Sequence, residues 1–165
     1  MFVIINTKAG EHMKTLVVYY SRKGYVEKIA DAKIKAEREQ GNEVDFLSLE
    51  TLSNTVSFDG FRNCVIKTVS GGSMELFPYE TDVASYDKVV ICTPVWCGKV
   101  ALPMKAFLTK EKHNINRAEY VIVSMSGGNT DAVADEMDKI LRLKREKYTS
   151  VQCVWGKIKK EEDFQ

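Results

Sequence analysis

The sequence lacks several features that would assign it at once to a specialised class of protein. Its apolar runs fall far short of the roughly 18 residues that a membrane-spanning helix needs. It also lacks an excess of charge of one sign, because 24 basic residues nearly balance 23 acidic residues and leave a net charge of +1. The one-sided basic surface of a nucleic-acid-binding protein is therefore not expected, and neither is a membrane partner.

Histidines and paired cysteine motifs are scarce as well. Two histidines accompany four cysteines, and no two cysteines have the C-x-x-C spacing of a zinc site, so we expect no metal site. The first residues carry a short apolar patch without a basic start, which argues against a secretory signal. We therefore predict a cytoplasmic location. In that reducing compartment the cysteine thiols are expected to stay free, at Cys64, Cys92, Cys97 and Cys153.

What the sequence does contain is enough apolar material for one domain. The chain has 165 residues, of which 44% are hydrophobic. Met13 and the following "KTLVVYY" make a natural start for a first strand. We therefore predict a domain over residues 13–158. An extension over residues 1–12, which is an appendage, an alternative start or an added edge strand, precedes it, and a frayed polar tail over residues 159–165 follows it.

Buried strands and amphipathic helices alternate along most of the chain. The predicted strands are short β-branched and aromatic runs, and Pro94 is expected to end the third of them. Apolar stripes at helical spacing follow the first, third and fourth strands. This alternation predicts a parallel sheet with helices on both faces. The predicted strands cover residues 15–20, 43–49, 88–93, 120–125 and 150–155.

The stretch from Glu50 to Ser85 is the least clear part of the sequence. Phe61, Val65 and Val69 have the spacing of a helix, whereas "CVIKTV" followed by "SGGS" would also suit a strand and a turn. Our prediction for this stretch is a helix and a long loop.

Three loops follow carboxyl ends of predicted strands: Ser21 to Val26, Pro94 to Lys99, and Ser126 to Thr130. In an open parallel sheet such loops meet at one edge, where ligands bind. The first loop has Gly24 and backbone N–H groups at a helix start, a combination that can hold a phosphate. Its residues alone slightly favour the alternative, a tight turn whose Arg22 and Lys23 are simply solvated.

The segments around these loops resemble the flavodoxin family in matching order. The resemblance is carried by "VVYYSRKGYVEKIA", "YDKVVICTPVWCGKVALPMKAFL" and "SMSGGNTDAVADEM", and it extends over about three quarters of the chain. It implies a flavodoxin-like α/β fold, a three-layer αβα sandwich around a five-stranded parallel sheet in the order 2-1-3-4-5. It also implies flavin mononucleotide (FMN) as the cofactor.

The resemblance further implies which residues bind FMN. The first loop matches the one that wraps the phosphate, the second flanks the flavin ring, and the third meets the pyrimidine edge of the flavin through its backbone. The implied cofactor-binding residues are Ser21, Arg22, Lys23, Gly24, Tyr25, Val26, Pro94, Val95, Trp96, Cys97, Gly98, Ser126, Gly127, Gly128 and Asn129.

Some of these residues have an alternative structural role. Trp96 occupies the place where an aromatic commonly stacks on the flavin, but it also suits an ordinary rim or core anchor. For Cys97 a small spacer is favoured over a redox-active thiol, because no activating histidine or second thiol is evident. Asn129 can also cap the following helix.

Three functions follow from this interpretation. The first is an FMN protein that carries electrons to a redox partner, a task for which no acid–base catalytic residue is needed. The second is NAD(P)H-dependent reduction of quinones or similar small-molecule acceptors, which the near-neutral charge favours mildly because familiar flavodoxins are strongly acidic. The third is a binding module that has lost its cofactor, because Ser21 alone keeps a hydroxyl where the family usually has three. A homodimer is left open.

Overall fold

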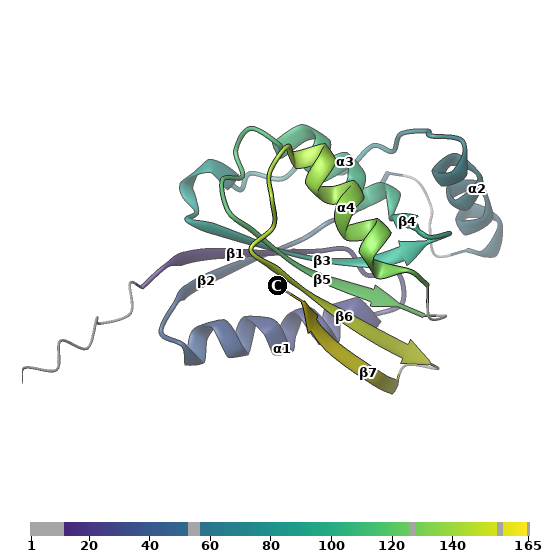
Figure 1. The fold of residues 1–165 in the computed structure, drawn as a ribbon. Coiled ribbons are helices and arrows are strands. Elements are labelled where there is room, and N and C mark those ends of the chain that lie inside the picture. The colour runs from purple at the N-terminus through teal and green to yellow at the C-terminus, as the bar shows by residue number, and fades with distance from the viewer. Residues whose placement is uncertain (1–11, 53–56, 126–127, 155–156, 165) are drawn as a thin grey trace, which may run out of the picture.

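The computed structural model describes residues 12–52, 57–125, 128–154 and 157–164 (Figure 1). Strands and helices alternate over most of this length. The elements are β1 Lys14–Tyr19, α1 Tyr25–Glu39, β2 Glu43–Ser48, α2 Phe58–Val69, a 3₁₀ turn Val83–Ser85, β3 Lys88–Trp96, β4 Lys99–Val100, α3 Leu102–Glu111, β5 Ala118–Ser124, α4 Thr130–Leu141, β6 Lys147–Val154 and β7 Lys157–Phe164.

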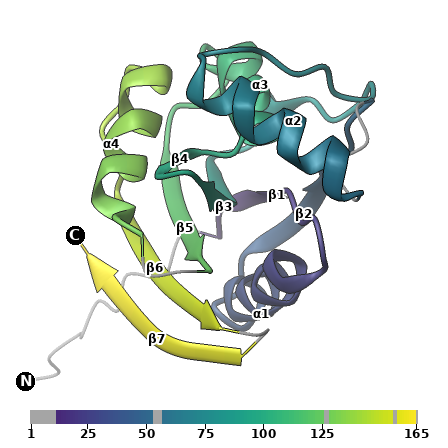
Figure 2. The same cartoon turned by 90° about the vertical axis from the view of Figure 1, so that its right-hand side faces the viewer.

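The described strands form one mainly parallel sheet in the order β2-β1-β3-β5-β6-β7. Its five parallel members, counted along the chain, have the order 2-1-3-4-5, so the predicted fold class is confirmed. β7 adds an antiparallel strand beside β6, and the short β4 pairs antiparallel with β3. Figure 2 shows α1 on one side of the sheet and α3 and α4 on the other.

Local sequence explains why these elements form where they do. In β1, Leu16, Val17 and Val18 are fully buried, as expected of a central strand covered on both faces. The helix α1 buries a stripe with the spacing i, i+4, i+8 against the sheet, and its last turn is closed at Gly41, whose N–H donates to the Arg38 carbonyl at 2.9 Å. Gly41 has a φ of +87°, a conformation that glycine adopts without strain.

Two separate apolar layers hold the sandwich together. The layer beneath α2, α3 and α4 is the larger one and includes Phe107 and Tyr120, both fully buried. The layer beneath α1 is built from the alternate residues of the same strands, such as Val17 and Val121. Because successive strand residues point to opposite faces, each central strand contributes to both layers.

A network of buried charges lies between α1 and the amino ends of the strands. The ammonium of Lys88 lies 2.9 Å from a Glu37 oxygen and 3.5 Å from a Glu119 oxygen. Lys33 of α1 pairs with the same two carboxylates, at 3.0 Å from Glu37 and 2.6 Å from Glu119. Burial alone raises the pKa of Glu37, but the hydrogen bonds and charges of Lys88 and Lys33 outweigh burial and hold this pKa below its usual value.

The third predicted strand is longer than the sequence indicated. We expected Pro94 to end it, but β3 continues through Pro94 to Trp96. Proline cannot donate a backbone hydrogen bond, which confines it to strand positions where no partner needs one. The pairing of β1 with β3 stops at Cys92, so beyond that residue β3 has β5 as its neighbour in the parallel sheet and tolerates the proline.

The prediction for the carboxyl-terminal tail is wrong. Residues 159–165 were expected to fray, but residues 157–164 form β7, which pairs with β6 along its length. Its sequence "KIKKEEDF" is mostly charged, and charged residues are typical of the outermost strand of a sheet. Of the extension predicted over residues 1–12, all but His12 lie outside the described residues.

The stretch from 50 to 85 contains the helix and the long loop that we predicted. The helix is α2, capped by the Ser57 hydroxyl, which accepts from the Gly60 N–H at 3.1 Å. A single antiparallel bridge between Thr51 and Leu76 joins the segments that enter and leave α2. In the described part of the chain, no helix has the length and apolar character that crossing a membrane requires.

Candidate functional site

A cleft of about 520 Å³ opens at the carboxyl edge of the sheet. This volume lies within the range of roughly 300–1,000 Å³ that is usual for small-molecule sites. Two of the three predicted loops line it, together with residues that the sequence analysis did not assign to the site. The lining residues are Ser21, Arg22, Lys23, Tyr25, Val26, Phe61, Pro94, Val95, Trp96, Met125 and Val154.

The first loop has the backbone of an anion-binding turn. Gly24 stands immediately before α1 with a φ of +81°, and α1 begins at Tyr25, so the free N–H groups of its first turn lie next to the cleft. Apart from its chain neighbours, the nearest atom to a side chain built on Gly24 would be a Glu27 oxygen at 3.8 Å. The glycine is thus required by its backbone conformation and not by crowding.

The Ser21 side chain is the buried polar group of this loop that lacks a partner in the described part of the chain. Its Oγ atom is buried and has no hydrogen-bond partner among the described residues. A buried hydroxyl without a partner costs free energy, on the order of 1–3 kcal/mol. An anionic oxygen in the cleft would remove that cost, and Arg22 and Lys23 beside it supply positive charge.

The second loop is a tight hairpin turn. Trp96 at the end of β3 pairs with Lys99 of β4, and the two residues between them both have positive φ, +50° at Cys97 and +73° at Gly98. Two central residues with positive φ are what a type I′ turn requires. Cys97 and Gly98 are exposed and do not line the cleft, which leaves Pro94, Val95 and Trp96 as its wall on this side.

Trp96 lines the cleft but is packed inward. It is only 5% exposed and makes edge-to-face contacts with Tyr20 and Phe61, at centroid distances of 5.7 and 5.3 Å. The guanidinium of Arg22 lies over the other aromatic neighbour, 4.0 Å from the centre of the Phe61 ring. Trp96 therefore has the core-anchor role that the sequence left open, and it shares the cleft wall with Phe61 and Arg22.

The third predicted loop is described in part. Ser126 and Gly127 lie outside the described residues. The N–H of Gly128 donates to the Ser124 Oγ at 2.8 Å, and Asn129 caps α4 by accepting from the Ala132 N–H at 3.2 Å. Gly128 and Asn129 are exposed at the same edge of the sheet, yet neither lines the cleft.

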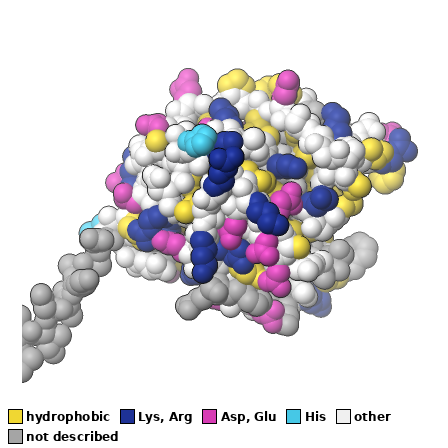
Figure 3. All heavy atoms as spheres, turned by 45° about the horizontal axis from the view of Figure 1, so that its top comes forward, with side chains coloured by type: hydrophobic (Ala, Val, Ile, Leu, Met, Phe, Trp, Pro, Cys, Tyr) yellow, Lys and Arg dark blue, Asp and Glu magenta, His cyan; other side chains and the backbone are white. Residues whose placement is uncertain are grey.

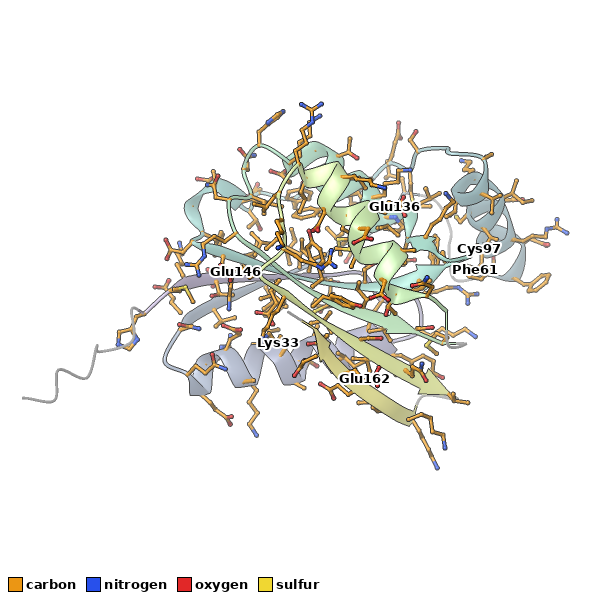
Figure 4. All side chains as sticks on the ribbon, in the orientation of Figure 1. Lys33, Phe61, Cys97, Glu136, Glu146 and Glu162 are labelled. Carbon is orange, nitrogen blue, oxygen red and sulfur yellow. The ribbon has the colours of Figure 1, made fainter. Side chains whose placement is uncertain are left out.

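Sequence reasoning missed three residues of the cleft. Phe61 comes from α2, in the stretch that was least clear in the sequence, and Figure 4 shows it at the same end of the molecule as Cys97. Met125 and Val154 follow β5 and end β6. Their position at the carboxyl ends of strands was a usable signal, because that edge of a parallel sheet is where ligands bind.

A parallel sheet in this strand order, with a cleft and a phosphate-type loop at its carboxyl edge, defines a flavodoxin-like α/β domain. Sequence comparison agrees, because the flavodoxin domain family matches residues 66–162, more than half of the chain. The chain therefore belongs to the flavodoxin family, as its motifs predicted.

Individual relatives are more distant. An NAD(P)H dehydrogenase (quinone) of Cupriavidus metallidurans is 33% identical over 100 residues, which are 58% of this chain and 45% of that protein. The chain thus spans less than half the length of this curated relative. A flavoprotein of Lactobacillus acidophilus, crystallised with FMN, is 22% identical and superposes with a TM-score of 0.64 over 85% of this chain and 92% of its own. A flavodoxin from the Archaea is 15% identical, with a TM-score of 0.53 over 78% of this chain and 75% of its own. These two structures support the fold.

Proposed function

We propose that the protein binds FMN in the cleft at the carboxyl edge and passes electrons to a redox partner. The observation that carries this proposal is the buried Ser21 hydroxyl, which has no partner among the described residues and lies beside the start of α1. Membership of a family that binds FMN supports the choice of ligand, as does the FMN complex of the structurally similar Lactobacillus acidophilus flavoprotein.

The residues of the first loop fit a phosphate group. Ser21 donates its hydroxyl proton, the first N–H groups of α1 donate from the backbone, and Arg22 and Lys23 balance the charge. The family usually has hydroxyl residues at the positions of Lys23 and Val26 as well. Two missing hydrogen bonds, each worth about 1.5–3 kcal/mol, weaken affinity by roughly a hundredfold or more, which the Lys23 charge recovers in part.

The rest of the cleft is apolar and aromatic. FMN, when bound, supplies one- and two-electron transfer. Phe61, Pro94 and Trp96 exclude water from this wall and are themselves uncharged, while the Arg22 guanidinium over the Phe61 ring belongs to the phosphate loop, where the phosphate balances its charge. Because an unpaired anion is costly in such surroundings, we expect the chain to hold the cofactor at a low midpoint potential.

Two other functions each have an observation in their favour. The curated relative is named as an NAD(P)H dehydrogenase of quinones, which favours a reductase of quinones or similar small acceptors. The inward packing of Trp96 and the single hydroxyl in the first loop favour a flavodoxin-fold module that has lost its cofactor. A homodimer is compatible with all three proposals.

An FMN titration of the purified apoprotein separates these functions. We expect one FMN per chain, detected by quenching of its fluorescence, and an affinity at least about tenfold lower in Ser21→Ala because a charged hydrogen bond is lost. Ser73→Ala, at an exposed residue after α2, is the matched control. Salt should weaken binding less in Lys23→Ala than in the wild type.

Turnover measurements decide between the reductase and the electron carrier. An FMN-loaded protein that oxidises NADPH in the presence of a quinone is a reductase, whereas one that exchanges electrons only with a protein partner is a carrier. A protein that takes up no FMN even at tens of micromolar flavin is neither of these, and the binding module would then be the correct interpretation.

A further inference from the structure

The helix α2 carries apolar residues on the side that faces away from the sheet. Phe58, Ile66 and Val69 are 77%, 58% and 62% exposed, whereas Cys64 on the opposite side is buried in the core. In Figure 3, hydrophobic and basic side chains lie together over the end of the molecule that holds α2. Exposed apolar side chains clustered on one helix are typical of a surface that another protein covers.

Basic residues outnumber acidic ones on α2 and in the two loops that line the cleft. On α2 and in the two loops that line the cleft, residues 21–26 and 94–99, the cations are Arg22, Lys23, Arg62, Lys67 and Lys99. The same segments contain a single acid, Asp59, which lies 3.6 Å from Arg62. A phosphate held by the first loop would neutralise charge at Arg22 and Lys23, and the surface would still keep an excess of positive charge.

The surface is continuous with the cleft. Phe61 belongs to α2 and lines the cleft, where its ring contacts Trp96 at 5.3 Å and lies beneath the Arg22 guanidinium at 4.0 Å. One side of α2 therefore forms part of the cleft wall, while its outer side is the apolar surface. A helix is about 10–12 Å across with its side chains, so a protein docked on α2 would lie within that distance of a ligand in the cleft.

We propose that the outer face of α2 and the basic residues around it form the docking surface for an acidic redox protein. The identity of the partner as an electron-transfer protein rests on the proposed function, whereas the sign of its charge rests on the residues of this chain. Phe58, Ile66 and Val69 supply apolar contact, and the surrounding cations steer the encounter and select a negatively charged surface.

A binding experiment that does not require FMN tests the surface. The probes are an acidic [2Fe–2S] ferredoxin and a basic c-type cytochrome, titrated calorimetrically into the apoprotein and the FMN-loaded protein at low and at physiological ionic strength. We expect the ferredoxin to bind both forms at low salt and to bind more weakly as salt is raised. The cytochrome should not bind.

Variants locate the interaction. Ile66→Ser should weaken ferredoxin binding about tenfold or more, because an apolar contact is lost. The double charge reversal Lys67→Glu with Lys99→Glu should weaken it by about tenfold at low salt, since each reversal replaces an attraction with a repulsion. The matched control is Lys144→Glu, which changes an exposed lysine between α4 and β6, and it should leave binding unchanged.

Each outcome supports or refutes either the docking surface or the proposed electron-carrier function. Any of three results overturns the docking surface. The cytochrome binds more tightly than the ferredoxin, the ferredoxin does not bind at low salt, or Lys144→Glu and the double reversal have equal effects. FMN uptake with any of these results leaves the proposed function in place. Ferredoxin binding that is sensitive to Ile66→Ser, in a protein that takes up no FMN, supports the docking surface and refutes the electron-carrier function.

Discussion

The buried charge network beneath α1 makes a sharp prediction for the substitution Lys88→Met. Lys88 is 5% exposed and lies between the carboxylates of Glu37 and Glu119, which are 1% and 2% exposed. Methionine fills a similar volume but leaves the two buried carboxylates with Lys33, which is partly exposed, and with Lys147, whose ammonium lies 3.5 Å from Glu119. Removing one partner of a buried ion pair costs about 3–5 kcal/mol, and we expect the melting temperature to fall by roughly 6–20 °C.

The same substitution should also show a pH dependence of known sign. The pKa of Glu37 in the folded protein lies below its ordinary value of 4.5. Its contribution to stability is therefore present above pH 4.5 and is lost as the pH falls through the folded-state pKa. The difference in stability between the wild type and Lys88→Met should thus be largest near neutral pH and should shrink in acid.

Urea unfolding followed by circular dichroism, at several pH values between neutral and acid, measures both effects. The double variant Lys88→Met with Glu37→Leu is the control, because it removes a cation and an anion together and leaves Lys33 with Glu119. It should recover most of the lost stability. The reasoning is refuted if Lys88→Met costs less than about 1 kcal/mol, or if the double variant is no more stable than the single one.

Three further predictions use other described residues. The Thr15 Oγ1 is buried without a hydrogen-bond partner among them, so Thr15→Val should stabilise the protein by about 1 kcal/mol, and an unchanged or lower melting temperature would contradict this. Gly98→Val should destabilise it by roughly 1–2 kcal/mol in thermal unfolding, because position 98 has a φ of +73° that valine adopts only with strain. A thiol reagent should label the exposed Cys97 in the native protein but Cys92 only after unfolding, since burial raises the pKa of Cys92 to about 12. Peptide mass mapping measures the labelling, and labelling of Cys92 in the native protein would refute this prediction.

The parallel sheet could be predicted from the sequence because its determinants are local. Runs such as "TLVVYY" and "KVVICT" are apolar on both faces, as central parallel strands require. β7 could not be found in this way, because "KIKKEEDF" has almost no apolar residues and becomes a strand through its pairing with β6. The hairpin at Cys97 was also hidden, since a non-glycine residue with positive φ has no reliable sequence signal.

The candidate site could likewise be predicted only in part from the sequence. That the loops after β1 and β3 meet follows from the strand order alone, and the cleft does contain Ser21 and Pro94 together. The place of Phe61 depends on where α2 packs, and neither its helical spacing nor its composition specifies that. The orientation of Trp96 is also a matter of tertiary packing, because Tyr20 and Phe61 hold its ring edge-on.

The strand β7 has a consequence for self-association. A sheet that stopped at β6 would offer a strand with open hydrogen-bonding groups to any extended peptide nearby. Instead the outermost position holds lysines and acids, and the pairing of β6 with β7 is interrupted by an irregularity at Gln152 and Cys153. A second chain that tried to extend the sheet there would have to dehydrate these charges along an uneven strand, and this opposes the growth of fibrils from that edge.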